Sequence, residues 1–219
     1  MHTIKMFLKF GKEQDITDLY RNGTIYMSPI QRFRKIEYGE LRGDLYEGAS
    51  SIKNYLPGQF EIPSIGFKGK HIGIHLRESY ENVLGNIYSL YCISSHGWEN
   101  PNDFKIDDRI KKFGSHCLMI KDNQKFLSLI EEKLNQLKIK FNHYLVEYYD
   151  KKAINRPISL FEKPLEYEYQ KEFRFYAERD STEPFVFKIG SLVDISELYS
   201  SNLIVDELKL QNQPQNNLQ

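Results

Sequence analysis

The residues best suited to chemistry lie in one stretch of the 219-residue chain, EYEYQKEFRFYAE, which runs from Glu166 to Glu178. With a period of two, the stretch separates into two rows, as side chains do along a β-strand. With a helical period the aromatic residues scatter around the axis, and Glu168 and Glu172 become a repelling i, i+4 pair. We therefore predict a single strand here, with one polar face formed by Glu166, Glu168, Gln170, Glu172, Arg174 and Tyr176.

The charges on this polar face permit two interpretations. Acids two residues apart on a strand are about 7 Å from each other, and gathering three carboxylates in a poor dielectric costs several kcal/mol unless cations or hydrogen bonds compensate them. Arg174 can compensate one of them. Either the face is solvated, in which case a Glu–Arg pair contributes about 0–1 kcal/mol, or a cleft lies over Gln170, Glu172 and Arg174.

A second candidate is the glycine-punctuated loop RGDLYEG, which carries Arg42, Asp44 and Glu47. Such a compact set of charges on a turn can be held over a site. It is also what an ordinary exposed turn looks like. The loop lacks the spacings GxxxxGK[ST] and GxGxxG, so nucleotide binding of those two types is not predicted.

A third candidate is a basic group near the start of the sequence. It consists of a lysine in the first predicted strand, two polar residues in the second and two arginines in the following helix: Lys9, Tyr26, Ser28, Arg32 and Arg34. These residues could form a small positive site for a phosphate group. The alternation of Lys5, Phe7 and Lys9 equally fits a row that faces solvent.

Histidine-based metal sites and acyl-transfer sites are not predicted. His71 and His75 lie four apart in a strand pattern, which places them about 13 Å apart, too far to share one zinc ion. His96 and His116 each follow a serine and could serve as a base or donor, although an isolated histidine beside a strand is more often structural. No nucleophile elbow GxSxG is present.

The surrounding elements are predicted from periodicity and breakers. The chain opens strand, helix, strand, helix: a strand over 4–10, a helix capped by Asp15 or Thr17 and ending at Asn22-Gly23, a strand over 24–28 and a helix over 29–37. Further segments follow: 61–67 and 71–76 around a turn at Lys68-Gly69-Lys70, a strand buried on both sides over 86–94, a short helix over 106–114, a strand over 115–120, a helix over 122–137, then 138–150, the acidic strand, 184–190 and 203–210.

This order predicts one α+β domain over residues 1–210 with a largely antiparallel sheet, followed by a polar, disordered tail over 211–219. Thirty basic and thirty acidic residues cancel, so no global field attracts nucleic acid or an anionic membrane. Cys92 and Cys117 lie in apolar runs without metal or disulfide spacing, and no stretch of roughly 20 apolar residues occurs. We expect a soluble protein in a reducing cytoplasm.

Two separate segments resemble the ADP-ribosyltransferase superfamily. KMFLKF, a helix and NGTIYMSPI are similar to the opening of DarT-type and related ADP-ribosyltransferases, and Gln170-Lys171-Glu172 is similar to their late-strand [Q/E]-x-E signature. Ser94-Ser95-His96 is a partial match to the middle motif. The chain also resembles a group of uncharacterised bacterial proteins with an E-x-x-x-E-x-R strand, here Glu168, Glu172 and Arg174.

The resemblance implies a split sheet that binds NAD, and an intracellular toxin or phage-defence effector with an antitoxin partner. Glu172 would then bind the nicotinamide ribose and stabilise the positive charge that grows as nicotinamide leaves, which is electrostatic catalysis. Gln170 would orient a nucleic-acid or protein acceptor, and Arg174 would hold a glutamate in place. The implied cofactor contacts are Lys9, Tyr26, Ser28, Arg42, Asp44 and Ser94.

Two other functions remain open at this stage. A metal-dependent nuclease-like protein could bind magnesium through Asp44, Glu47, Glu168 and Glu172, since magnesium prefers oxygen ligands. A non-catalytic binding module could instead use the aromatic residues, which make up 14% of the chain, as interface anchors.

Overall fold

The computed structural model describes residues 3–35, 45–80, 85–95 and 104–210. The first half contains β1 (Ile4–Gly11), α1 (Glu13–Asn22), β2 (Thr24–Pro29), α2 (Ile30–Lys35), β3 (Ala49–Tyr55), β4 (Gly58–Ile62), β5 (Phe67–His71), β6 (Ile74–Ser79) and β7 (Asn86–Ser94). The second half contains the 3₁₀ helix η3 (Asp108–Phe113), β8 (His116–Ile120), α3 (Asn123–Gln136), β9 (Phe141–Leu145), β10 (Glu147–Tyr149), β11 (Arg156–Pro157), β12 (Glu162–Pro164), the 3₁₀ helix η4 (Leu165–Gln170), β13 (Glu172–Ala177), β14 (Phe185–Lys188), β15 (Ser196–Ser200) and α4 (Ser201–Glu207).

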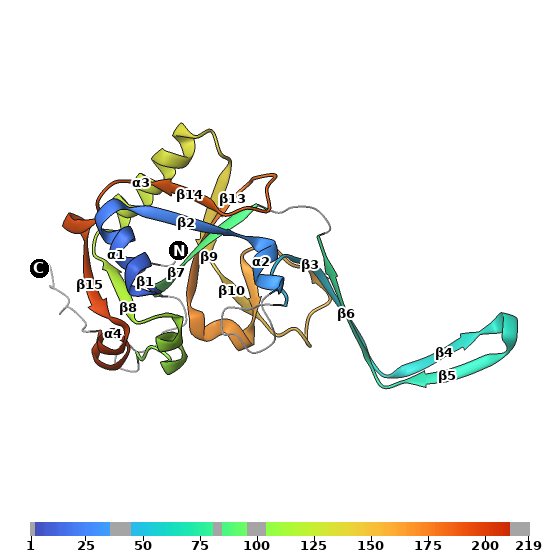
Figure 1. Cartoon of the computed structure of the whole chain (residues 1–219). Helices are drawn as coiled ribbons and strands as arrows, with labels where there is room; N and C mark the ends of the chain where they lie inside the picture. Colours follow the sequence, from blue (N-terminus) through green and yellow to red (C-terminus); the bar gives the residue numbers. More distant parts are fainter. Residues whose placement is uncertain (1–2, 36–44, 81–84, 96–103, 211–219) are drawn as a thin grey trace, which may run out of the picture.

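The fold is α+β and its sheets are mostly antiparallel, as predicted (Figure 1). The largest sheet has eight strands with β7 near its centre. One edge of β7 pairs with β13, which in turn pairs with β9. Its other edge is shared, because β2 pairs at residues 86–87 and β1 at residues 91–94. The sheet therefore forks along β7, with β14 beyond β2 on one branch and β8 and β15 beyond β1 on the other.

Apolar residues cover both faces of this sheet. One face packs against α1 and α3 through a cluster that includes Phe7, Phe126 and Phe175. The other packs against η3 and α4 through a cluster that includes Leu8 and Ile110. The prediction that 86–94 is buried on both sides is confirmed. The prediction that Phe7 belongs to a solvent-facing row is wrong, since α3 covers this face of β1 and the fully buried Phe7 packs against Phe126 and Phe173.

The predicted acidic strand is half wrong. Only Glu172–Ala177 is a strand, while Leu165–Gln170 forms a 3₁₀ helix. The reason is the lack of neighbours, because β9 ends opposite Phe173 and β10 turns away to pair with β12. Residues before Glu172 satisfy backbone groups locally instead, as in the bond from the Lys171 amide to the Glu168 carbonyl.

Two further boundaries differ from the prediction. The hairpin turns at Pro63–Ile65 and Gly66, whereas Lys68–Lys70 lie inside β5, because Pro63 cannot donate a ladder hydrogen bond and Gly66 adopts a left-handed φ of 65°. Helix α1 ends at Asn22 before a left-handed Gly23, as predicted, but its N-cap is Lys12. Pro29 ends β2 instead of opening α2. The predicted tail at 211–219 lies outside the described residues.

The ends of β3 and β6 and the segment between them form a long two-stranded ribbon. We call residues 55–76 of this ribbon the arm. β3 pairs with β6, and beyond a break at Leu56-Pro57 and Ile72-Gly73 the ribbon continues as β4 paired with β5. Figure 1 shows the β4–β5 part extending away from the rest of the chain.

Candidate functional site

The candidate site lies at the junction between η4 and β13. Gln170 is the last residue of η4 and Glu172 the first of β13. Between them, Lys171 adopts a left-handed backbone with φ of 39°, which is unfavourable for a residue with a Cβ. Hydrogen bonds on both sides stabilise this kink. The Lys171 amide donates to the Glu168 carbonyl at 3.1 Å, and the Lys171 carbonyl accepts from the Cys92 amide at 2.7 Å. The chain thus places Gln170 and Glu172 next to each other, both buried.

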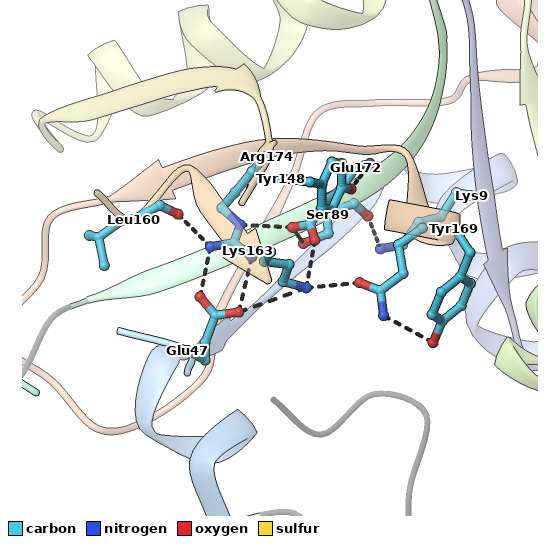
Figure 2. Close-up of polar contacts among 10 residues, drawn as sticks. Lys9, Glu47, Ser89, Tyr148, Leu160, Lys163, Tyr169, Glu172 and Arg174 are labelled. Carbon is cyan, nitrogen blue, oxygen red and sulfur yellow. Dashed lines mark hydrogen bonds and ion pairs between the residues drawn. The ribbon is translucent and has the colours of Figure 1, made fainter. Parts of the chain in front are cut away.

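Arg174 is the centre of a buried charge network that joins three distant parts of the chain (Figure 2). Its Nε donates to Glu172 Oε1 at 2.7 Å. Its other nitrogens bind the carboxylate of Glu47 bidentately, at 2.7 and 3.0 Å, and the carbonyl of Leu160. Arg174 is completely buried, and both glutamates are nearly so. Such bidentate pairs fix orientation as well as charge.

Lys163, on β12, is the second cation of this network. Its Nζ lies 2.8 Å from Glu172 Oε2 and 3.9 Å from Glu47 Oε2. It also donates to Gln170 Oε1 at 2.8 Å, and Gln170 in turn donates to the Tyr169 hydroxyl at 3.3 Å. Two carboxylates therefore face two cations, and the formal charges of the four groups cancel.

The network keeps Glu172 ionised despite its burial. Burial alone raises the pKa of this carboxyl, but the charges of Arg174 and Lys163 and their hydrogen bonds outweigh it and hold the pKa well below its ordinary range. Burial likewise lowers the pKa of Arg174, but Glu172 and Glu47 outweigh it and raise that pKa above its usual value. Removing one partner of such a network leaves an uncompensated buried charge.

Ser89, on β7, links this network to the fork in the sheet. Its hydroxyl donates to Glu172 Oε1 at 2.5 Å, while its carbonyl accepts from Lys9 Nζ at 2.6 Å. Lys9 also lies over the Tyr88 ring, 4.1 Å from the centroid. The registers place Glu172 on the sheet face of Leu8 and Tyr91, and Lys9 on the opposite face. Lys9 and Glu172 therefore both contact Ser89, but they do not share a pocket.

Little space remains beside Glu172 among the described residues. A cavity of about 20 Å³ is lined by Cys92, Ser94, Leu145, Val146, Tyr148, Lys171 and Glu172. This volume suits about one water molecule. The Tyr148 hydroxyl accepts from the Glu172 amide at 2.9 Å, and burial raises the pKa of the Cys92 thiol to about 12, so that this thiol stays protonated.

The other predicted cofactor contacts are only partly brought together. Ser94 is buried and lines the cavity beside Glu172. Ser28 is opposite Ile87 on the same sheet face as Glu172, and Tyr26 lies two residues earlier on β2. Tyr26 is half-exposed and its hydroxyl accepts from Arg32 at 2.9 Å. Arg42 and Asp44 lie outside the described residues.

The acids proposed for magnesium do not form a cluster in the described part of the chain, where no three acidic, histidine or cysteine side chains are placed to hold a metal ion. Glu172 and Glu47 instead face Arg174 and Lys163. Glu168 pairs with Lys171 at 2.8 Å in a half-exposed position. Arg174 and Lys163 thus bind the carboxylate oxygens that a metal ion would need. Asp44 lies outside the described residues.

Sequence reasoning missed Lys163, Ser89 and Tyr148. A signal existed for Ser89, the polar residue in the middle of the run IYSLYCI. The unbalanced acids of the predicted strand also called for a cation besides Arg174. Nothing in the segment FEKPLEY marks Lys163 as that cation, because its role depends on β12 lying beside β10 and η4.

Comparisons with family models, with curated proteins and with solved structures give no match to this chain. Within the described residues, no helix combines the length and apolar character needed to cross a membrane. The function must therefore be inferred from the site itself.

Proposed function

We propose that this chain is an NAD-dependent ADP-ribosyltransferase that acts as a toxin or phage-defence effector in the cytoplasm, with Glu172 as its catalytic carboxylate. The observation that supports the proposal is the setting of Glu172, which is buried, ion-paired with Arg174 and Lys163, and fixed at the first residue of a central strand. Unpaired burial would neutralise such a group, so the surrounding cations preserve its negative charge.

The proposed reaction is a substitution at C1′ of the nicotinamide ribose. The glycosidic C–N bond breaks and its electron pair leaves with neutral nicotinamide, while an acceptor oxygen or nitrogen bonds to C1′ and releases a proton. Positive charge develops on the ribose in the transition state. A fixed carboxylate at that place lowers the barrier, since it needs no reorganisation as the charge forms.

The other network residues act through Glu172 in this proposal. Arg174 orients the carboxylate, and Gln170, held by Lys163, is placed to orient the acceptor. Glu47 is a positioning residue, because it compensates Arg174 and Lys163 and so limits how far they offset the field of Glu172. Lys9 holds the Ser89 carbonyl on the other sheet face. Tyr26, Ser28, Ser94 and the loop with Arg42 and Asp44 remain the proposed NAD contacts.

Substrate entry sets a structural requirement. A dinucleotide is far larger than the cavity of about 20 Å³ beside Glu172, and Lys163 occupies Oε2. Binding therefore requires Lys163 to leave Glu172 as the ribose hydroxyl replaces it. The proposal also includes an acceptor, either nucleic acid or protein, and an antitoxin partner.

The test is calorimetric titration of NAD together with an assay of nicotinamide release. Glu172→Gln keeps the shape but removes the charge, so release should fall by about 100-fold or more while NAD still binds. Glu168→Gln is the matched control, because Glu168 belongs to the same sequence motif but pairs with Lys171 on η4, and it should retain activity.

Circular dichroism of both variants checks that they fold. An absence of NAD binding by the wild-type protein, or full activity of Glu172→Gln, would contradict the proposal. If the wild-type protein binds NAD without releasing nicotinamide, the chain is a binding module of this fold and not an enzyme.

A further inference from the structure

Both carboxylate oxygens of Glu172 are occupied by other groups of the chain. Oε1 accepts from Arg174 Nε at 2.7 Å and from the Ser89 hydroxyl at 2.5 Å. Oε2 lies 2.8 Å from Lys163 Nζ. A ligand hydroxyl can bind this carboxylate only if one of these groups gives way. The observed arrangement is therefore a closed state of the site.

Arg174 and Lys163 differ in how firmly they are held. Arg174 is completely buried on β13, and its planar guanidinium binds two glutamates and the Leu160 carbonyl, each in a fixed direction. Lys163 carries a compact ammonium group on a flexible stem. It lies on the three-residue strand β12, which pairs with β10 in a separate two-stranded sheet. Lys163 is therefore the cation that can leave Glu172.

A second carboxylate lies close enough to receive the ammonium group of Lys163 (Figure 2). Glu47 Oε2 is 3.9 Å from Nζ, an ion-pair distance just beyond the reach of a hydrogen bond. Glu47 is as buried as Glu172. The Tyr167 ring, with its centroid 5.6 Å from Nζ, is a further favourable neighbour for a cation. Lys163 can therefore exchange one glutamate for the other while the buried charges stay compensated.

The two positions of Lys163 differ in what they do to Glu172. In the observed position Nζ also donates to Gln170 Oε1 at 2.8 Å, which favours the closed state. In the other position Glu47 faces two cations, because Arg174 already binds it bidentately. Glu172 then keeps one cation and has a free oxygen, so its negative field is offset less. The second position is thus the one suited to stabilising positive charge on a ligand.

We propose that Lys163 is an autoinhibitory latch, which rests on Glu172 and moves to Glu47 when a ligand hydroxyl takes its place at Oε2. The latch rests on the proposed function for the identity of that ligand, the nicotinamide ribose of NAD. Its two positions are a property of the chain alone. Because only the open state binds, the population of the closed state lowers the apparent affinity.

The first test is crystallographic and needs no NAD. In the wild-type protein, Lys163 Nζ should lie on Glu172. Glu172→Gln removes the charge that holds it, so Nζ should move to within about 3.0 Å of Glu47 Oε2. Glu168→Gln is the matched control, because Glu168 pairs with Lys171 and its loss should leave Lys163 in place.

The second test is the Kd for NAD, measured by calorimetry. Lys163→Met removes the latch, so Kd should fall by about 10-fold or more. Glu47→Gln removes the charge at the second position, so Kd should rise. A merely structural role would weaken binding in both variants, whereas the latch requires opposite signs. Lys151→Met is the control, since Lys151 pairs with the half-exposed Glu166 and its loss should leave Kd unchanged.

Two results would overturn the latch. One is an ammonium group that stays at residue 172 or turns to solvent in Glu172→Gln. The other is a Kd that rises or stays constant in folded Lys163→Met. If Lys163→Met does not fold, the crystal structure of Glu172→Gln decides alone. If neither the wild-type protein nor Lys163→Met binds NAD, the proposed activity fails, and the crystal structures still decide whether Lys163 has two positions.

Discussion

At the scale of single residues, Glu172 owes its charge to its neighbours. A carboxyl group with only 4% of its surface exposed would ordinarily take up a proton. Arg174 and Lys163 prevent this, and Ser89 and the Tyr148 hydroxyl bind the same residue from β7 and β10. The stability that this carboxylate contributes must consequently depend on pH.

The sign of that dependence follows from the lowered pKa of Glu172. In acid, the unfolded chain binds a proton at this glutamate near its ordinary pKa of about 4.3, while the folded chain does not. The unfolded state then binds more protons, so stability falls as pH falls. The contribution is complete above about pH 4.3 and is lost by about 1.4 kcal/mol per pH unit below it, until the folded pKa is reached.

We therefore expect the free energy of unfolding of the wild-type protein to exceed that of Glu172→Gln most at pH 7, and the difference to shrink between pH 4.3 and 3. Urea denaturation at pH 7, 5 and 3.5 measures it. Glu168→Gln is the control, since a half-exposed pair contributes only about 0–1 kcal/mol. A difference that is constant from pH 7 to 3.5 would show that the carboxylate is not held ionised.

At the scale of elements, close approach of two strands constrains the backbone near the site. Gly114 precedes β8 with φ of 147°, and a Cβ there would lie 2.1 Å from the backbone of Gly11 on β1. Neither backbone can yield without separating β1 from β8, which pair at Gly11 and His116. β1 in turn carries Lys9 to the fork.

Gly114→Ala should accordingly destabilise the protein by more than about 2 kcal/mol, through steric overlap in addition to backbone strain. Gly190→Ala is the matched control, because Gly190 also has a positive φ, of 91°, but open space around it. We expect about 1–2 kcal/mol from strain alone at that position. Urea midpoints of the two variants give the comparison, and equal losses would refute the steric argument.

The elements also show what sequence reasoning can and cannot reach. Local patterns placed β1, α1, β2, β7 and α3, because breakers such as Gly23 and the cap Asp122 act within a few residues. Alternation failed at 165–170, since a strand needs a partner at its edge and β10 turns away there. Glu172 and Arg174 were recognised from their type, whereas Lys163 joins them only through the packing of β12.

At the scale of the whole molecule, the arm and the sheet are separate in their packing. The members of the three buried apolar clusters all lie outside residues 55–76. The arm is therefore not expected to support the core. A two-stranded ribbon is itself marginally stable in water, so it contributes little to the free energy of unfolding.

Replacing residues 56–73 by Asn-Gly should leave the core intact, because Tyr55 and Ile74 are already paired and this dipeptide forms a tight hairpin turn. Relative to the wild-type protein, the free energy of unfolding should change by less than about 0.5 kcal/mol. Urea denaturation of the shortened and the wild-type protein measures the change. A loss of several kcal/mol would mean that the arm packs on the body.

The bond between Arg174 and Glu47 spans 127 positions of the chain. Closing so long a loop is entropically unfavourable until most of the sheet exists, so we expect these two side chains to meet after the folding transition state. Weakening the pair would then accelerate unfolding and hardly slow refolding. This contact therefore affects the lifetime of the native protein more than the rate at which it forms.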